Sequence, residues 1–162
     1  FKKIPENILF LNLSNSNFQK IDSITHLKNL EFLDIHRTML TDIKGIAELQ
    51  SLQILNLSQE TYTDKYEKRA SIDISFFREL TELKNLRLLI LSEKDFNLIS
   101  KFKSIYRLLK EKTCVIKESN SRHTWSYDLL KILNVSERNK SENQKKKVNF
   151  SKLKALYSYS SK

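Results

Sequence analysis

The chain has 162 residues, 40% hydrophobic and 30% charged, which is ordinary for one globular domain. Gly45 and Pro5 are its only glycine and proline, which argues against turn-rich barrels and sandwiches and against glycine-rich nucleotide-binding loops. The formal net charge of +10 is uneven: residues 131–162 hold nine Lys or Arg against two Glu, so a basic segment follows a nearly neutral body.

The first predicted element is a short strand near the start of the chain. Residues 1–7 look like the closing loop of an earlier repeat, in which Pro5 fixes the approach to that strand. Apolar residues then alternate at first and later recur at intervals of three, which predicts a strand, a turn and a helical return. They are Ile8, Leu11, Leu13, Phe18, Ile21, Ile24 and Leu27.

A second repeat follows the first at a constant offset. Adding 22 to each of the seven positions gives Leu30, Leu33, Ile35, Leu40, Ile43, Ile46 and Leu49, all of which are apolar. A segment of this size cannot bury its own apolar face. Successive repeats are therefore expected to pack side by side and to share one continuous core.

A third repeat begins in register at Leu52 and is then interrupted by a polar, charged segment at about 60–71. The apolar pattern resumes at Ile72, Ile74, Phe77, Leu80 and Leu83. The next strand is predicted to begin at Leu86, which lies beyond the position that the period alone would give it. We expect an insertion of the length of the polar segment on the loop side, with the packing of the repeats intact.

The fourth repeat is predicted to merge into a cap. Its apolar positions are Leu86, Leu89, Leu91, Phe96, Ile99, Phe102 and Ile105. Residues 104–112 are predicted to form a helix with Ile105, Leu108 and Leu109 on one face, followed by a strand at 114–116. Cys114 is expected to pack there as a small apolar residue. Beyond the cap we predict a helical extension over 118–135 and a basic, partly flexible tail over 136–162.

Four segments carry a family resemblance: ILFLNLSNSNFQKIDSITHLKNL, LEFLDIHRTMLTDIKGIAELQSL, LQILNLS and LRLLILSEKDFNLI. They resemble the leucine-rich repeat superfamily in its short, 22-residue intracellular type. The resemblance covers residues 1–117 and implies an α/β leucine-rich repeat solenoid with a concave parallel β-sheet and a helical C-terminal cap. The slot that usually carries a buried Asn holds Ser16, Thr38, Glu60 and Lys94, of which only the two hydroxyls are expected to replace its bonds.

The resemblance implies that the domain recognises or scaffolds another protein, within a multi-subunit complex, because this repeat supports many unrelated binders. The stretch IHRTML, together with LTDIKGI, is more weakly similar to the leucine-rich substrate receptors of cullin ubiquitin ligases. A substrate-receptor subunit is therefore one alternative, although no helix with the adaptor-docking box of such receptors is found.

The predicted site lies on the concave face, which receives every second side chain of each strand. Phe10, Phe32, Ile54 and Leu88 form an apolar row there, which we expect to be exposed and to bind a partner protein. The predicted partner-binding residues are Phe10, Asn12, Phe32, Asp34, His36, Arg37, Ile54, Asn56, Leu88 and Ile90. The alternative is that the row is covered by the chain's own C-terminal segment or by a flanking repeat.

Asp34, His36 and Arg37 are the compact charged cluster of that face, and the spacing lets Asp34 and His36 resemble an acid–base pair. Catalysis also needs a nucleophile or metal and a water-excluding pocket, and the sequence indicates neither, so we expect no enzyme and no cofactor. We predict a polar specificity contact instead. His26 and His123 lack companions at ligand spacing, so no metal site is predicted.

The basic tail supports a further alternative. Lys145, Lys146, Lys147, Lys152 and Lys154 form a basic stretch, with Trp125, Tyr127, Tyr157 and Tyr159 as nearby aromatic residues. Nucleic-acid binders combine positive charge with stacking rings, so a nuclear or ribonucleoprotein component that contacts RNA is possible on these residues. A solvated tail or a nuclear-import signal explains the same residues.

The cysteine content and the hydropathy of the sequence limit the cellular compartments that we expect for this protein. Cys114 is the only cysteine, which excludes an intrachain disulfide or a CxxC metal pair and favours a reducing, intracellular environment in the cytoplasm or nucleus. No stretch approaches the roughly 18 apolar residues of a membrane helix, so we expect a soluble protein without a membrane partner.

Overall fold

The computed structural model describes residues 4–40, 42–58 and 74–117. The chain divides into one part over Phe1–Glu118 and a second over Ser119–Lys162, and all described residues belong to the first. The predicted insertion at 60–71, the helical extension over 118–135 and the tail over 136–162 lie outside the described residues.

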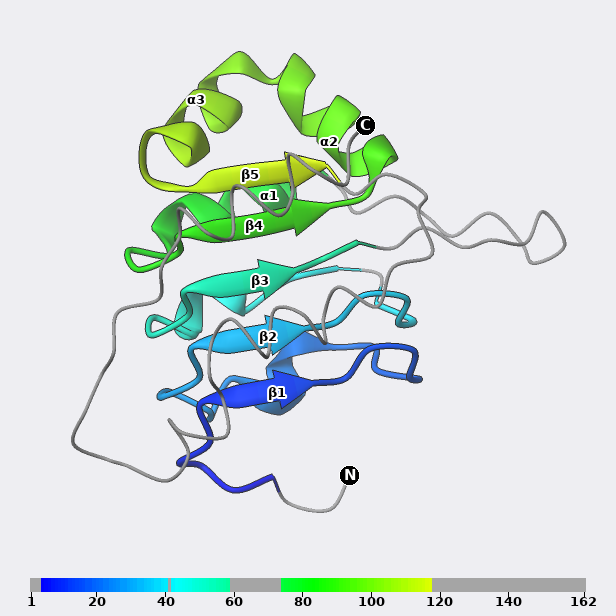
Figure 1. Cartoon of the computed structure of the whole chain (residues 1–162), viewed down its shortest axis with the longest axis vertical. Helices are drawn as coiled ribbons and strands as arrows, with labels where there is room; N and C mark the ends of the chain where they lie inside the picture. Colours follow the sequence, from blue (N-terminus) through cyan, green and yellow to red (C-terminus); the bar gives the residue numbers. More distant parts are fainter. Residues whose placement is uncertain (1–3, 41, 59–73, 118–162) are drawn as a thin grey trace, which may run out of the picture. The chain divides into compact units, whose positions relative to one another are not determined.

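The described residues form an α/β arrangement built on one parallel sheet (Figure 1). Its five strands lie side by side in chain order and are β1 (Phe10–Asn12), β2 (Phe32–Asp34), β3 (Ile54–Asn56), β4 (Leu88–Leu91) and β5 (Cys114–Lys117). The register follows the sequence repeat, because Phe32 pairs with Phe10 on one side and Ile54 on the other. Ile54 pairs with Leu88, so the longer connection between β3 and β4 leaves the pairing unchanged.

The same backbone bonds join each repeat to the next. One carbonyl oxygen of the earlier repeat accepts from two successive N–H groups of the later one. The carbonyl of Leu9 accepts from Glu31 and Phe32 (2.8 and 3.0 Å), that of Glu31 from Gln53 and Ile54 (2.8 and 3.0 Å), and that of Gln53 from Arg87 and Leu88 (2.8 and 3.0 Å). Recurrence of these bonds fixes each strand against its neighbour.

Short 3₁₀ helices return the chain after the first three strands. They are η1 (Ile21–Ile24), η2 (Ile46–Glu48) and η3 (Glu79–Glu82), the last preceded by the single-turn α1 (Ile74–Phe77). A 3₁₀ helix has about three residues per turn, so side chains at every third position lie on one side. For this reason Ile21, Ile24 and Leu27 all reach the core. The predicted intervals of three are confirmed and correspond to 3₁₀ turns.

Two α-helices replace the 3₁₀ return after β4, namely α2 (Glu93–Lys101) and α3 (Lys103–Lys112). Ser92 caps α2, since its Oγ accepts from the Asp95 N–H at 3.1 Å and donates to Asp95 Oδ2 at 2.9 Å. Strand β5 follows α3 directly and confirms the predicted final strand. The side chain of Cys114 lies outside what the structure describes.

Two of the predicted core positions are wrong. Phe102 is 41% exposed and Leu108 is 47% exposed. Phe102 lies at the junction between α2 and α3, where the helical spacing is broken. In α3 the buried side is set by Ile105 and Leu109, one helical turn apart, and Leu108 lies beside that side rather than on it.

The core lies on one face of the sheet. Alternate strand residues of β2, β3 and β4 and the residues just after them pack there with the apolar residues of the returns, Ile99 and Leu109. They are Leu33, Ile35, Leu55, Leu57, Leu89 and Leu91, all fully buried. Full burial of one such side chain contributes about 1.5–3 kcal/mol. The apolar strand slots read from the sequence are thus part of the core in repeats two to four.

Within the described ranges, none of the helices has both the length and the apolar character needed to cross a bilayer.

Candidate functional site

The candidate site is the face of the sheet opposite the core. Successive strand side chains alternate, so Phe32 and Asp34 lie opposite Leu33. The register aligns Phe10, Phe32, Ile54 and Leu88 into one row, as the sequence predicts. None of the four belongs to the core cluster. We call them the second-face row.

The second-face row is not exposed, which corrects the sequence-based expectation. Phe32, Ile54 and Leu88 are each 1% exposed, and Phe10 is partly buried. The expectation assumed a sheet with one wet face, whereas parallel sheets are generally covered on both. The alternative that the chain's own C-terminal segment covers the row falls outside the described residues.

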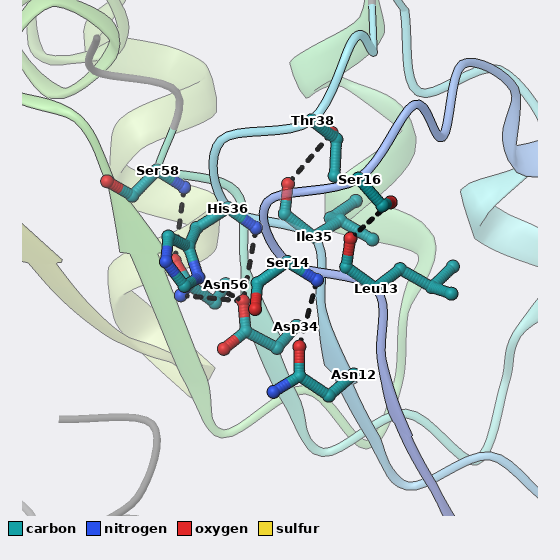
Figure 2. Close-up of polar contacts among 10 residues, drawn as sticks. All are labelled: Asn12, Leu13, Ser14, Ser16, Asp34, Ile35, His36, Thr38, Asn56 and Ser58. Atoms are coloured by element: carbon teal, nitrogen blue, oxygen red, sulfur yellow. Dashed lines mark hydrogen bonds and ion pairs between the residues drawn. The ribbon is translucent and has the colours of Figure 1, made fainter. Parts of the chain in front are cut away.

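A polar group of side chains lies at the carboxyl ends of β2 and β3 (Figure 2). We call Asp34, His36, Asn56 and Ser58 the strand-end cluster. Asp34 Oδ1 accepts from the His36 N–H at 3.1 Å and from Asn56 Nδ2 at 3.0 Å, and it lies 2.8 Å from His36 Nδ1. The Asp34 and Asn56 side chains are fully buried, whereas that of His36 is 15% exposed. Asp34 Oδ2 has no hydrogen-bond partner among the residues that the structure describes.

The residues of the strand-end cluster belong to a turn that recurs in the first three repeats. The side-chain oxygens of Asn12, Asp34 and Asn56 accept from the backbone N–H two positions further on, at 2.8, 3.1 and 3.1 Å. Such Asx turns suit Asn and Asp because the short side chain can bond its own backbone. Asn15 and Arg37, which hold matching positions in the first two repeats, follow with positive φ of 55° and 51°. The recurring Asn or Asp is the sequence signal for this turn, and the apolar pattern alone does not reveal it.

Side-chain hydroxyl groups hydrogen-bond to the backbone around this turn. Ser16 Oγ donates to the carbonyl of Leu13, and Thr38 Oγ1 donates to that of Ile35 at 2.9 Å. Both bonds stay within one repeat. Lys94, at the corresponding slot of the fourth repeat, is an exposed residue of α2, and Glu60 lies outside the described residues.

The proximity of Asp34 and His36 has a structural origin. Asp34 Oδ1 is occupied by the turn and by Asn56, so this carboxylate ends one repeat and links it to the next. Among the described residues, no three His, Cys, Asp or Glu side chains gather in a way that could hold a metal ion. The arrangement holds the His36 imidazole at the rim of the face.

Asp95 is a second buried carboxyl group near the strand ends. Burial raises its pKa above the ordinary value of 3.8, while the hydrogen bond from Ser92 and the charge of Lys94 act in the opposite direction. Within the described part of the chain, its Oδ1 has no hydrogen-bond partner. The spacing of apolar residues does not reveal this group, because neither helix capping nor the burial of Asp95 can be read from it.

The other predicted site residues differ in how exposed their side chains are. Arg37 is partly buried at the rim beside His36, Asn12 is exposed, and Ile90 is fully buried. The lysines predicted to contact nucleic acid, at 145–147, 152 and 154, lie outside the described residues.

No family model matches this sequence, and no curated protein matches it. Among solved structures, the crystal structure of internalin C2 from Listeria monocytogenes is similar at 23% identity and a TM-score of 0.27. The match covers 52% of this chain and 52% of that one, so the chain matches about half the length of the internalin. A likeness of this degree carries no weight, and the fold and site rest on the described geometry.

Proposed function

We propose that the chain is a non-enzymatic recognition or scaffold domain that binds another protein on the concave face of a leucine-rich repeat solenoid, with α2, α3 and β5 as its C-terminal cap. One observation carries the proposal. The register aligns an apolar row beside a polar cluster, on a face whose side chains do not belong to the core cluster.

The two parts of the face suit different tasks. The second-face row offers apolar area, which drives association, and the strand-end cluster offers directional hydrogen bonds, which select a partner. Because Phe32 is 1% exposed in the chain alone, a partner that uses the row must displace whatever covers it. His36 and Arg37, which are partly exposed, would be reached first.

The non-enzymatic assignment rests on the strand-end cluster. Asp34 Oδ1 serves the turn of its own repeat and the amide of Asn56, so its carboxylate has a structural task that explains its position beside His36. An intracellular site of action is inferred from the lone Cys114. The narrower roles, as a ubiquitin-ligase substrate receptor or an RNA-contacting component, stay predictions.

The test is quantitative affinity capture with the full chain as bait. Arg37→Glu reverses a charge at the rim and is expected to remove a partner that the unchanged chain captures. Lys44→Glu makes the same change at an exposed position near η2 and serves as the matched control. If partner capture is lost with Lys44→Glu alone, or is kept by both variants, the result would argue against binding on the concave face.

Phe32 is a poor first variant. If Phe32 were exposed, as the sequence predicts, a charged residue there would leave the melting temperature nearly unchanged. Its side chain is only 1% exposed, which gives a different expectation. Removing a buried Phe costs roughly 3–5 kcal/mol, so lost binding would be confounded by lost folding.

A further inference from the structure

Two apolar side chains of the α2 and α3 region are exposed to solvent. Within the described ranges, the large apolar residues with exposed side chains are Met39, Phe102 and Leu108, at 47%, 41% and 47% exposure. Phe102 ends α2 and directly precedes α3, and Leu108 lies within α3. Both present apolar area to solvent, although α3 also has a buried side, formed by Ile105 and Leu109.

Basic side chains accompany these two apolar residues. Lys101 and Lys103 flank Phe102 in the sequence, and both are exposed. Lys103, Arg107 and Lys110 recur at the spacing of an α-helix, which places them on one side of α3, opposite its buried residues. All three are exposed. The outward side of α3 is therefore positively charged.

Little negative charge offsets these basic residues. Residues 101–111 hold four Lys or Arg and a single acidic residue, Glu111. Its carboxylate lies 3.9 Å from Arg107 Nε, and an exposed pair of this kind adds little to stability. Within the described part of the chain, no ion pair engages Lys101 or Lys103. Positive charge next to exposed apolar side chains suits a partner that is negatively charged at its surface and apolar beneath it.

We propose that this surface binds an anionic phospholipid bilayer. We call it the α2–α3 surface, and it consists of Lys101, Phe102, Lys103, Arg107, Leu108 and Lys110. The basic side chains contact the negatively charged head groups, and Phe102 and Leu108 reach the acyl boundary beneath them.

A bilayer is favoured over a nucleic acid because a leucine side chain has no ring to stack on bases, whereas acyl chains remove it from water. Contact with one leaflet needs no helix that crosses the membrane, so it is compatible with the hydropathy of the chain. The proposal does not depend on the concave face, because none of the six residues belongs to the predicted partner-binding set.

The experiment measures sedimentation of the full chain with phosphatidylcholine vesicles that contain or lack phosphatidylserine. At low salt, binding is expected to be at least about tenfold tighter to the vesicles with phosphatidylserine, because each basic residue near an anionic surface strengthens binding by about fivefold. The double variant Lys101→Glu, Lys103→Glu is expected to weaken this binding by at least about tenfold. The matched control, Lys20→Glu with Lys44→Glu, makes the same change of charge at exposed positions in the first two repeats and is expected to keep most of the binding.

The apolar contact is tested separately. Phe102→Ser is expected to weaken binding by about fivefold, whereas Met39→Ser, at an equally exposed apolar residue of the second repeat, is expected to leave it unchanged. Circular-dichroism melts check that both variants fold.

Three results would overturn the proposal. The first is no preference for phosphatidylserine at low salt. The second is equal binding by the two charge variants, since basic residues elsewhere in the chain would then explain it. The third is binding that Phe102→Ser and Leu108→Ser both leave unchanged, or that polyglutamate or RNA matches in affinity, since the surface would then recognise negative charge without a bilayer.

Discussion

Asp34 performs two tasks with one oxygen atom. Its Oδ1 accepts from the His36 N–H to end β2, and from the Asn56 side chain to join two repeats. Asn12 and Asn56 perform the turn task with a neutral amide. A buried carboxylate costs more to desolvate than an amide. Asp34 differs from Asn12 and Asn56 in that its Oδ1 also lies 2.8 Å from His36 Nδ1.

The buried carboxyl group of Asp95 makes the stability of the folded chain depend on pH, and its burial determines the sign of that dependence. Its folded-state pKa lies above the unfolded value of 3.8, so the folded chain holds this proton more tightly than the unfolded chain. Stability therefore falls as pH rises from about that value through the folded pKa, and the full cost of the buried charge applies above it. Asp95→Asn removes the ionisation and keeps an acceptor for Ser92.

The expected result is that Asp95→Asn gains stability relative to the unmodified chain as pH rises from about 3.8 toward neutrality. Urea unfolding at a series of pH values measures this difference. A difference that stays constant over the whole series would show that the carboxyl group does not titrate differently in the folded chain.

At the residue scale, the sequence predicts which residues hold equivalent positions in the repeats better than it predicts how exposed each side chain is. The slots of Leu33 and Ile35 follow from the constant period, and their full burial agrees with it. The burial of Phe32 does not follow, because it depends on what covers the second face. The exposure of Phe102 does not follow either, because it depends on where α2 ends.

At the scale of elements, Gly45 connects three 3₁₀ helices. Its φ of 86° precedes η2, and its N–H donates to Glu79 Oε2 in η3 at 2.9 Å. A Cβ at this position would lie 2.9 Å from Asp22 Oδ1 and 3.2 Å from Thr25 Cγ2. The Asp22 carboxylate can move aside, so the backbone conformation is the larger obstacle to a side chain.

Gly45→Ala is accordingly expected to destabilise the chain by about 1–2 kcal/mol, the usual cost of a left-handed conformation for a residue with a Cβ. Thermal unfolding followed by circular dichroism measures it. The same substitution in an Asp22→Ala background separates the two causes, since a cost set by φ is unchanged there. Full recovery in that background would assign the effect to the contact with Asp22.

The elements themselves were largely predictable. Strands and returns follow from alternation that changes to intervals of three, and the register follows from the constant period. The choice between a 3₁₀ turn and an α-helix could not be read from intervals of three in a short segment. The α2 helix depends on the cap that Ser92 and Asp95 form, which is a local hydrogen-bond geometry.

At the scale of the whole described part, stability is expected to vary along the sheet. Leu11, Leu33 and Leu55 hold the same position in successive repeats, but only the last two are fully buried. Leu33→Ala and Leu55→Ala are expected to cost about 2–5 kcal/mol each, and Leu11→Ala clearly less, because its cavity would open toward solvent. Urea unfolding of the three variants compares them directly, and equal costs would contradict a partly buried first repeat.

The paired hydrogen bonds at the carbonyls of Leu9, Glu31 and Gln53 also determine how the sheet responds to force. These bonds run between strands, not along them. Tension that separates β1 from β4 acts on the ladders in series, so each ladder carries the same force and the weakest is expected to open first. Tension along the strands loads every bond of a ladder at once. The described sheet is thus mechanically weak in one direction and resistant in the other.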